Sequence, residues 1–269
     1  MKINPILNTQ KFCSNTRDVR MSSQTKKVVS DDLGQYEIDL NILLYSNFTV
    51  FFRPDLSSVE SQFGNWDEFK KVVRDNFENT PKVNVYNFAC SDGSETYSLA
   101  TALIDEFKED SDKFFPIKAS DLDSEMVERA SSGLVACSSD DIIRMRYNLS
   151  KDTHQSFETF KTQNPFDFRY KYYFRANDDL RSKIEFSQAD IEEEIKKIAP
   201  DNNLILCRNF WPYLGKKKAT KVLTELLQKL DKTSIVAIGS FDKTVPYIEP
   251  IFIENGFIEI SPNVYKKMR

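Results

Sequence analysis

Hydrophobic and polar residues alternate along the chain in two patterns, one typical of strands and the other of amphipathic helices. Short apolar runs predict five strands, at 83–90, 116–123, 184–190, 204–209 and 234–240. Apolar residues at helical spacing predict helices that flank these runs, at 66–79, 95–110, 124–133, 217–230 and 245–255. Two last runs, 257–260 and 263–268, flank Pro262 like a closing hairpin. This alternation indicates a doubly wound α/β fold with a mostly parallel sheet and a C-terminal antiparallel hairpin.

Two regions show weaker patterns. Residues 134–183 are charged and aromatic, and we expect only helices and irregular connections there. Residues 1–30 hold six Lys or Arg against one Asp, a charge of +5, and are otherwise rich in Ser, Thr, Asn and Gln. This composition predicts a disordered basic leader over 1–34, followed by one domain over 35–269. A mitochondrial presequence has a similar composition, but no convincing amphipathic helix supports that alternative.

The composition of the whole chain excludes several classes of protein. The 269 residues carry 37 Lys and Arg against 41 Asp and Glu, so the net charge of −4 offers no general attraction to nucleic acid. No apolar run approaches the ~20 residues that span a membrane, so we expect no membrane insertion. The four cysteines lie far apart, which is typical of a reducing compartment, here the cytoplasm. The single histidine, His154, excludes a multi-histidine metal site, and its polar neighbours predict a solvated surface side chain.

Polar residues follow four of the predicted strands. Glu95 comes after the first strand, Asp121 ends the second, Asp190 ends the third, and Arg208 and Asn209 end the fourth. The carboxyl ends of parallel strands meet at one edge of a sheet, and ligands of open α/β sheets bind there. We therefore expect these side chains to surround one ligand.

The turn after the first strand indicates the charge of that ligand. Residues 90–96 contain one glycine, two carboxylates and no Lys or Arg, so a diphosphate would meet repulsion there. S-adenosylmethionine is net positive and suits this turn, and Asp121 is placed to accept hydrogen bonds from two ribose hydroxyls. Two alternatives remain open: Asp121 and Asp123 could cap a helix, and Glu95 could be a first-turn acid favoured by the helix dipole.

Four segments, in this order along the chain, resemble the motifs of the CheR-type chemotaxis receptor methyltransferases, which transfer a methyl group from S-adenosylmethionine to glutamate side chains. Residues 47–53 resemble N-x-T-x-F-F-R, and residues 90–98 resemble S-x-G-E-E-P-Y-S. Residues 119–123 resemble T/S-D-I-D, and residues 207–214 resemble C-R-N-x-x-I-Y-F. The resemblance runs from about residue 47 to the C-terminus and implies a Rossmann-like methyltransferase sheet.

The resemblance also implies roles for the matching residues. Asn47, Thr49 and Arg53 would line the cofactor pocket, and Arg53 would also face the acceptor carboxylate. Glu95 and Asp121 would hold the methionine and ribose portions of the cofactor. The other implied positions are Asp190 and Ile191 beside the adenine, Arg208 and Asn209 after the fourth strand, and Tyr213 near the transferring methyl group. Arg53 and Tyr213 are thus the candidate catalytic residues; the alternatives are a surface salt bridge for Arg53 and a half-buried packing role for Tyr213. Phe51 and Phe52 fit core packing better than chemistry.

The chain departs from the family pattern in three places. The turn has Ser94 and Thr96 where the family has Glu and Pro, and the family's G-H-S-E after the fifth strand is Gly239–Asp242. Only 46 residues precede the first motif, where family members have a helical substrate-binding domain. The family's small β insertion would have to fit between about Phe166 and Lys183.

The resemblance implies a protein substrate with an acceptor glutamate, such as a chemoreceptor-like protein, and we expect the enzyme to be a monomer. Methyl transfer from a sulfonium to a carboxylate is an in-line displacement that depends mainly on alignment and water exclusion, so the scarcity of histidine is no obstacle. Two alternatives remain. The chain could be a methyltransferase of another protein or a small molecule, or a module that binds the cofactor without turnover.

Overall fold

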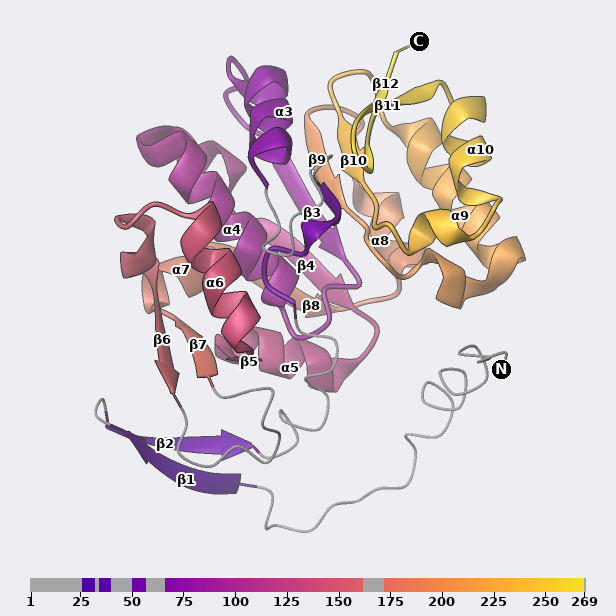
Figure 1. Cartoon of the computed structure of the whole chain (residues 1–269). Helices are drawn as coiled ribbons and strands as arrows, with labels where there is room; N and C mark the ends of the chain where they lie inside the picture. The colour runs from indigo at the N-terminus through magenta and orange to yellow at the C-terminus, as the bar shows by residue number, and fades with distance from the viewer. Residues whose placement is uncertain (1–25, 32–33, 40–49, 57–65, 162–171, 269) are drawn as a thin grey trace, which may run out of the picture.

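The computed structural model describes residues 26–31, 34–39, 50–56, 66–161 and 172–268. Seven of its strands are β3 (Asn84–Phe88), β4 (Ile117–Asp121), β8 (Ile184–Gln188), β9 (Asn203–Leu206), β10 (Ile235–Ala237), β11 (Phe257–Ser261) and β12 (Val264–Lys267). They form one sheet in the order β11-β12-β10-β9-β3-β4-β8 (Figure 1). The five strands from β10 to β8 are parallel, whereas β12 and β11 pair antiparallel at one edge. The predicted fold class, including the C-terminal hairpin, is confirmed.

Helices connect these strands. They are α3 (Asp67–Phe77), α4 (Ser94–Phe107), α5 (Ser124–Ser132), α6 (Ser139–Asn148), α7 (Asp178–Ser182), α8 (Ile191–Lys197), α9 (Gly215–Lys229) and α10 (Ile248–Glu254). Short 3-10 turns are η3 (Pro54–Leu56), η4 (Lys108–Phe114), η5 (Thr153–Ser156), η6 (Trp211–Leu214) and η7 (Asp242–Thr244). In α3, Phe69, Val73 and Phe77 are buried at helical spacing, as their positions in the sequence predict.

The central strands are buried on both faces of the sheet. Val85 of β3 belongs to a core cluster with residues of α3 and α4. The next residue, Tyr86, belongs to a second cluster with residues of α8, α9 and α10. Figure 1 shows the same layers, with α3 and α4 on one side of the sheet and α8, α9 and α10 on the other. Because successive side chains of a strand point to opposite faces, the strands read as nearly continuous apolar runs.

Residues 134–183 contain a second sheet that the sequence analysis did not predict. Strands β5 (Leu134–Cys137), β6 (Phe157–Lys161) and β7 (Tyr172–Ala176) pair antiparallel in the order β5-β7-β6. The expectation of only helices and irregular connections was therefore wrong. The β insertion expected between about Phe166 and Lys183 stays a prediction, because part of that stretch lies outside the described residues. Phe157 and Phe160 are the buried residues of β6. Their three-residue separation imitates helical spacing, which hid the strand.

A separate hairpin lies near the N-terminus. Strands β1 (Lys26–Asp31) and β2 (Gly34–Asp39) pair antiparallel. They occupy part of the stretch where the sequence suggested a disordered leader, and residues 1–25 lie outside the described residues. The boundary between leader and domain therefore stays a prediction.

His154 is not the solvated surface residue that its polar neighbours predicted. Its ring packs 5.4 Å from the ring of Phe157, measured between centroids. Its Nε2 atom is buried and has no hydrogen-bond partner among the described residues. The prediction was wrong because η5 places this ring against β6. Within the described ranges, no helix is long and apolar enough to cross a membrane.

Candidate functional site

The turn between β3 and α4 lies at the carboxyl edge of the sheet and is fixed by backbone contacts. Gly93 precedes α4 with a φ of 85°, and a Cβ atom there would lie 2.9 Å from the Cβ of Ala130. Glycine is the residue that fits both restrictions. The amide of Ser91 donates to Oδ2 of Asp121 at 2.8 Å, and the amide of Cys90 donates to the carbonyl of Ser120 at 3.0 Å. These bonds bring the turn and the end of β4 together.

Asp121 is the last residue of β4 and is half-buried. Besides the bond from Ser91, its carboxylate accepts the amide of Asp123 on Oδ1 at 3.0 Å. Each oxygen retains a lone pair for a further donor. Burial raises the pKa of Asp121, and the backbone donors oppose that shift. Asp123 caps α5 by accepting the amide of Glu125 at 2.9 Å, so helix capping is confirmed for Asp123 and not for Asp121.

Glu95 lies in the first turn of α4 and is held from two sides. Nδ2 of Asn87, which is fully buried on β3, donates to Oε1 at 2.8 Å. Nη1 of Arg208 donates to Oε2 at 2.7 Å. Burial raises the pKa of Glu95, whereas the charge of Arg53 and the Asn87 donor lower it. The side chain keeps 18% of its surface exposed.

Arg208 joins Glu95 to a segment far away in the sequence. Its fully buried guanidinium forms ion pairs with both Glu95 and Asp55, and it lies 5.6 Å from the ring centroid of Trp66. Nε has no hydrogen-bond partner among the described residues. Burial and the nearby charge of Arg53 lower the pKa of Arg208, whereas the charge of Asp242 raises it. We call this buried unit the Asp55–Arg208–Glu95 triad.

Residues 50–56 form a short strap across this edge. The amide of Phe51 donates to Oδ1 of Asp141 at 3.0 Å, and the amide of Phe52 donates to Oγ of Ser98 at 3.0 Å. The side chains of Phe51 and Phe52 are buried, as predicted. The strap is therefore tied to α6 and α4 by its backbone.

The rest of the strap reaches the loop after β10. The carbonyl of Arg53 accepts a hydrogen bond from Nε1 of Trp66 at 2.9 Å. The charge of Arg53 lowers the pKa of Glu95, so its guanidinium lies within electrostatic reach of that carboxylate. Oδ2 of Asp55 accepts the amide of Ser240 at 3.0 Å. The structure thus brings Arg53 and Glu95 to the same site.

Asp242 is a buried residue of this edge to which the sequence analysis gave no role. Its carboxylate accepts three amides, from Gly239 at 2.8 Å, Asn209 at 2.7 Å and Trp211 at 3.1 Å. Burial raises the pKa of Asp242 to about 6, against the effect of these donors. The side chain of Asn209 also leaves no room at Gly239, where a Cβ would lie 2.0 Å from Oδ1 of Asn209. The available signal was the match to G-H-S-E, which keeps the glycine and an acid in the last position.

Asp190 and Ile191 lie at the start of α8. Asp190 caps the helix by accepting the amide of Glu192 at 3.0 Å, and its Oδ2 pairs with Nζ of Lys218 at 3.2 Å. The Glu192 amide and Lys218 lower the pKa of Asp190. Ile191 is partly buried against the cluster that contains α9. Asp190 is thus at the expected edge but already bonded, and its role beside an adenine stays a prediction.

Tyr213 lies in η6, just after β9, and 56% of its surface is exposed. The half-buried packing role considered for it is therefore wrong. Its ring centroid is 5.5 Å from that of Phe241, which follows β10 and is 40% exposed. Asn47 and Thr49 lie outside the described residues.

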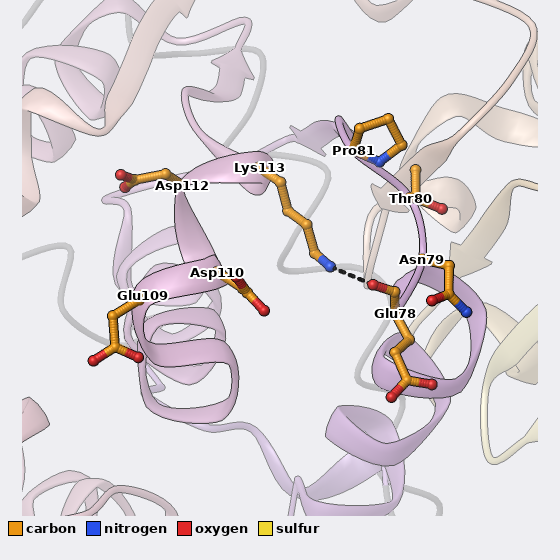
Figure 2. Close-up of a pocket in the computed structure, with 8 residues that line it drawn as sticks. All are labelled: Glu78, Asn79, Thr80, Pro81, Glu109, Asp110, Asp112 and Lys113. Atoms are coloured by element: carbon orange, nitrogen blue, oxygen red, sulfur yellow. Dashed lines mark hydrogen bonds between the residues drawn. The ribbon is translucent and has the colours of Figure 1, made fainter.

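Two surface cavities lie away from this edge. The larger, of about 390 Å³, is at the amino ends of β3 and β4. Nζ of Lys113 donates there to the carbonyl of Glu78 at 3.0 Å, a hydrogen bond that is drawn in Figure 2. The second, of about 340 Å³, is lined by residues that include Tyr97 and Arg181. None of the predicted site residues that the structure describes lines either cavity. The charged groups at the carboxyl edge define the candidate site instead.

The carboxyl edge combines the carboxylates of Glu95 and Asp121 with the guanidinium of Arg53. Residues 90–96 add acids but no cation. A diphosphate would meet two carboxylates there, whereas a nucleoside with a cationic tail would find acceptors for its ammonium and its hydroxyls. The fold and this edge therefore define a nucleoside-binding α/β domain that suits S-adenosylmethionine.

The chain belongs to the CheR methyltransferase family. The family described as "CheR methyltransferase, SAM binding domain" matches residues 47–249, so the cofactor of this domain is S-adenosylmethionine. The match begins at the first of the four motifs and includes the strap, the triad and the loop after β10.

Two curated relatives have the name chemotaxis protein methyltransferase 2. The protein from Vibrio cholerae is 22% identical over 197 residues, which cover 72% of this chain and 61% of that protein. The protein from Pseudomonas aeruginosa is 22% identical over 222 residues, covering 79% and 68%. The chain thus spans about three fifths of the Vibrio relative. Among solved structures, the magnesium protoporphyrin IX methyltransferase of Synechocystis PCC 6803, crystallised with bound SAM, is 12% identical to this chain. The similarity covers 75% of this chain and 77% of that chain, with a TM-score of 0.39.

Proposed function

We propose that the chain transfers a methyl group from S-adenosylmethionine to the carboxylate of a glutamate side chain in a protein. The observation that carries this proposal is the arrangement of charges at the carboxyl edge. Glu95 and Asp121 offer acceptors to a cationic cofactor, and Arg53 brings a cation to the same place for an anionic acceptor. Membership of the CheR family and the names of the two bacterial relatives support the same activity.

The residues at this edge fit the cofactor. Glu95 would accept hydrogen bonds from its ammonium, and the remaining lone pairs of Asp121 would accept its ribose hydroxyls. Asp190 and Ile191 would lie beside the adenine. Arg208 is fully buried and already paired twice, so we assign it to positioning Glu95 rather than to cofactor contact. When bound, S-adenosylmethionine supplies an electrophilic methyl group on sulfur.

The acceptor requires little acid–base chemistry. A glutamate side chain, with an ordinary pKa of about 4.3, is already an anionic nucleophile near neutral pH. The new oxygen–carbon bond forms as the sulfur–carbon bond breaks, and the products are a methyl ester and S-adenosylhomocysteine. Arg53 would orient the incoming carboxylate through a charge-assisted hydrogen bond, and Tyr213 would help to exclude water.

The test is a transfer assay with methyl-labelled S-adenosylmethionine, the full chain and a protein extract from its source cells. We expect label on protein that is released as methanol by mild base, because carboxyl esters hydrolyse there. Base-stable label would contradict a glutamate ester and indicate N-methylation. If S-adenosylhomocysteine binds in calorimetry but no protein or small molecule is labelled, the chain is a non-catalytic module.

A further inference from the structure

Two exposed lysines and an exposed aromatic pair lie at the carboxyl edge, and of these four residues only Tyr213 has been given a role so far. Lys216 and Lys217 are exposed at the start of α9, and among the residues that the structure describes neither forms an ion pair. Tyr213 and Phe241 expose 56% and 40% of their surfaces while their rings pack together. We call these four residues the basic-aromatic surface.

Lys218 fixes the position of this surface. Its ammonium pairs with Asp190 at 3.2 Å and with Glu192 at 3.1 Å, both at the start of α8. Since α8 follows β8 and η6 follows β9, the first turn of α9 lies at the carboxyl edge of the sheet. Phe241 follows β10, the strand next to β9. The surface is therefore continuous with the edge that carries Glu95 and Asp121.

The sequence of this helix start works against helix stability. The first turn of α9 has no acid, and no side chain from the described part of the chain caps it. A lysine near a helix N-terminus opposes the dipole and costs about 0.3–1 kcal/mol. Lys218 offsets this cost through two ion pairs, whereas Lys216 and Lys217 have none among the described residues. Local features that disfavour the fold concentrate at functional sites, which indicates a binding role for these two lysines.

We propose that the basic-aromatic surface binds an acidic polypeptide segment that carries the acceptor glutamate. An apolar side chain beside that glutamate would pack on Tyr213 and Phe241, and flanking carboxylates would face Lys216 and Lys217. This inference rests on the proposed function, because the surface would bring the acceptor glutamate to the edge where Arg53 lies.

The charge of the chain favours an acidic polypeptide over a nucleic acid. The net charge of −4 repels any polyanion, so only a short acidic segment gains from a local cationic patch. Two lysines could contact far fewer phosphates than the roughly 6–10 that a DNA-binding protein contacts. Because the rest of the chain is net negative, an acidic segment is attracted only at Lys216 and Lys217. This also fixes the orientation in which the segment binds.

The first test measures binding to the full chain in the presence of S-adenosylhomocysteine. The probe is a fluorescein-labelled glutamate-rich peptide with a leucine beside its central glutamate, and fluorescence anisotropy reports its affinity. The double variant Lys216→Glu/Lys217→Glu is compared with Lys71→Glu/Lys232→Glu, which changes two other exposed lysines and gives the same net charge. Thermal melting of both variants checks that they fold.

We expect the first double variant to bind the peptide about tenfold more weakly than wild type, and the control variant to bind it like wild type. A peptide with glutamines in place of the flanking glutamates should bind all three proteins weakly. Equal affinity of wild type and the first variant, or no binding of the acidic peptide to wild type at low salt, would overturn the proposal.

The second test measures methyl transfer to the same peptide and separates this proposal from the proposed function. We expect the first double variant to raise KM and leave kcat near wild type. If wild type binds the peptide through these lysines but transfers no methyl group, the binding role of the surface is supported and the proposed methyl transfer to glutamate is contradicted. If wild type and the first double variant transfer the methyl group with the same KM, methyl transfer to glutamate is supported and the binding role of the surface is refuted.

Discussion

Asp55→Asn removes one of the two carboxylates that face Arg208 while it keeps the size of the side chain. The side chain of Arg208 is 0% exposed and that of Asp55 is 8% exposed, so water screens this ion pair very little. The change also affects the strap, because Asp55 accepts the amide of Ser240 on its other oxygen. Asparagine keeps one acceptor oxygen and cannot serve both partners. We therefore expect a clear loss of stability.

The magnitude follows from what remains around Arg208. Removing one partner of a buried ion pair typically costs about 3–5 kcal/mol, because the other charge is left without compensation. Here Glu95 still accepts from Arg208 at 2.7 Å, so the guanidinium keeps one partner. We expect Asp55→Asn to lower the free energy of unfolding by about 3 kcal/mol, the lower end of that range.

Urea unfolding followed by circular dichroism measures this loss. Glu193→Gln is the matched control, because Glu193 pairs with Lys196 at 2.6 Å while both side chains are more than 60% exposed. An exposed pair contributes about 0–1 kcal/mol, so the control should unfold close to wild type. If Asp55→Asn loses no more than Glu193→Gln, the triad does not stabilise the strap and our reasoning from burial is refuted.

Three further changes test the site. Arg53→Ala should abolish methyl transfer while the unfolding midpoint stays near wild type, and unchanged turnover would remove Arg53 from the chemistry. Asp121→Ala should weaken S-adenosylhomocysteine binding in calorimetry by about 1–3 kcal/mol through lost ribose hydrogen bonds; equal affinity would leave Asp121 a structural role only. Arg208→Met should remove the cation that is hydrogen-bonded to Glu95, whose pKa burial already raises from 4.5 to about 7. The folded state then binds more protons than the unfolded state, so stability should fall as pH rises from about 4.5 to above 7, and a flat profile would contradict this.

The sequence predicted the main sheet well because burial dictates its pattern. All four residues of β9 (Asn203–Leu206) are buried, and the apolar run at 204–209 marked that strand. The predicted strand went too far at its C-terminus, since Arg208 and Asn209 lie beyond it. That error has a physical cause: Cys207 and Arg208 are also buried, so burial alone did not show where the pairing ends.

The sequence could not predict contacts that depend on three-dimensional packing. Asp55 and Arg208 are 153 residues apart, and Arg208 and Glu95 are 113 apart. In the sequence alone, each of these three charged residues looks like an ordinary exposed side chain. For Asp190, the sequence correctly placed the residue at the end of a strand. It could not show that the carboxylate is already bonded to the amide of Glu192 and to Lys218.

The triad also changes how the C-R-N motif is understood. A side chain that is fully buried between two acids has little surface left for a ligand, so Arg208 acts through its neighbours. One of these neighbours, Glu95, is the candidate contact for the cofactor, and the other, Asp55, lies two residues from Arg53, the candidate contact for the acceptor. A single buried cation therefore fixes the spacing between the two halves of the proposed reaction. Because in-line transfer depends on alignment more than on acid–base groups, this spacing is the quantity that a methyltransferase of this kind has to control.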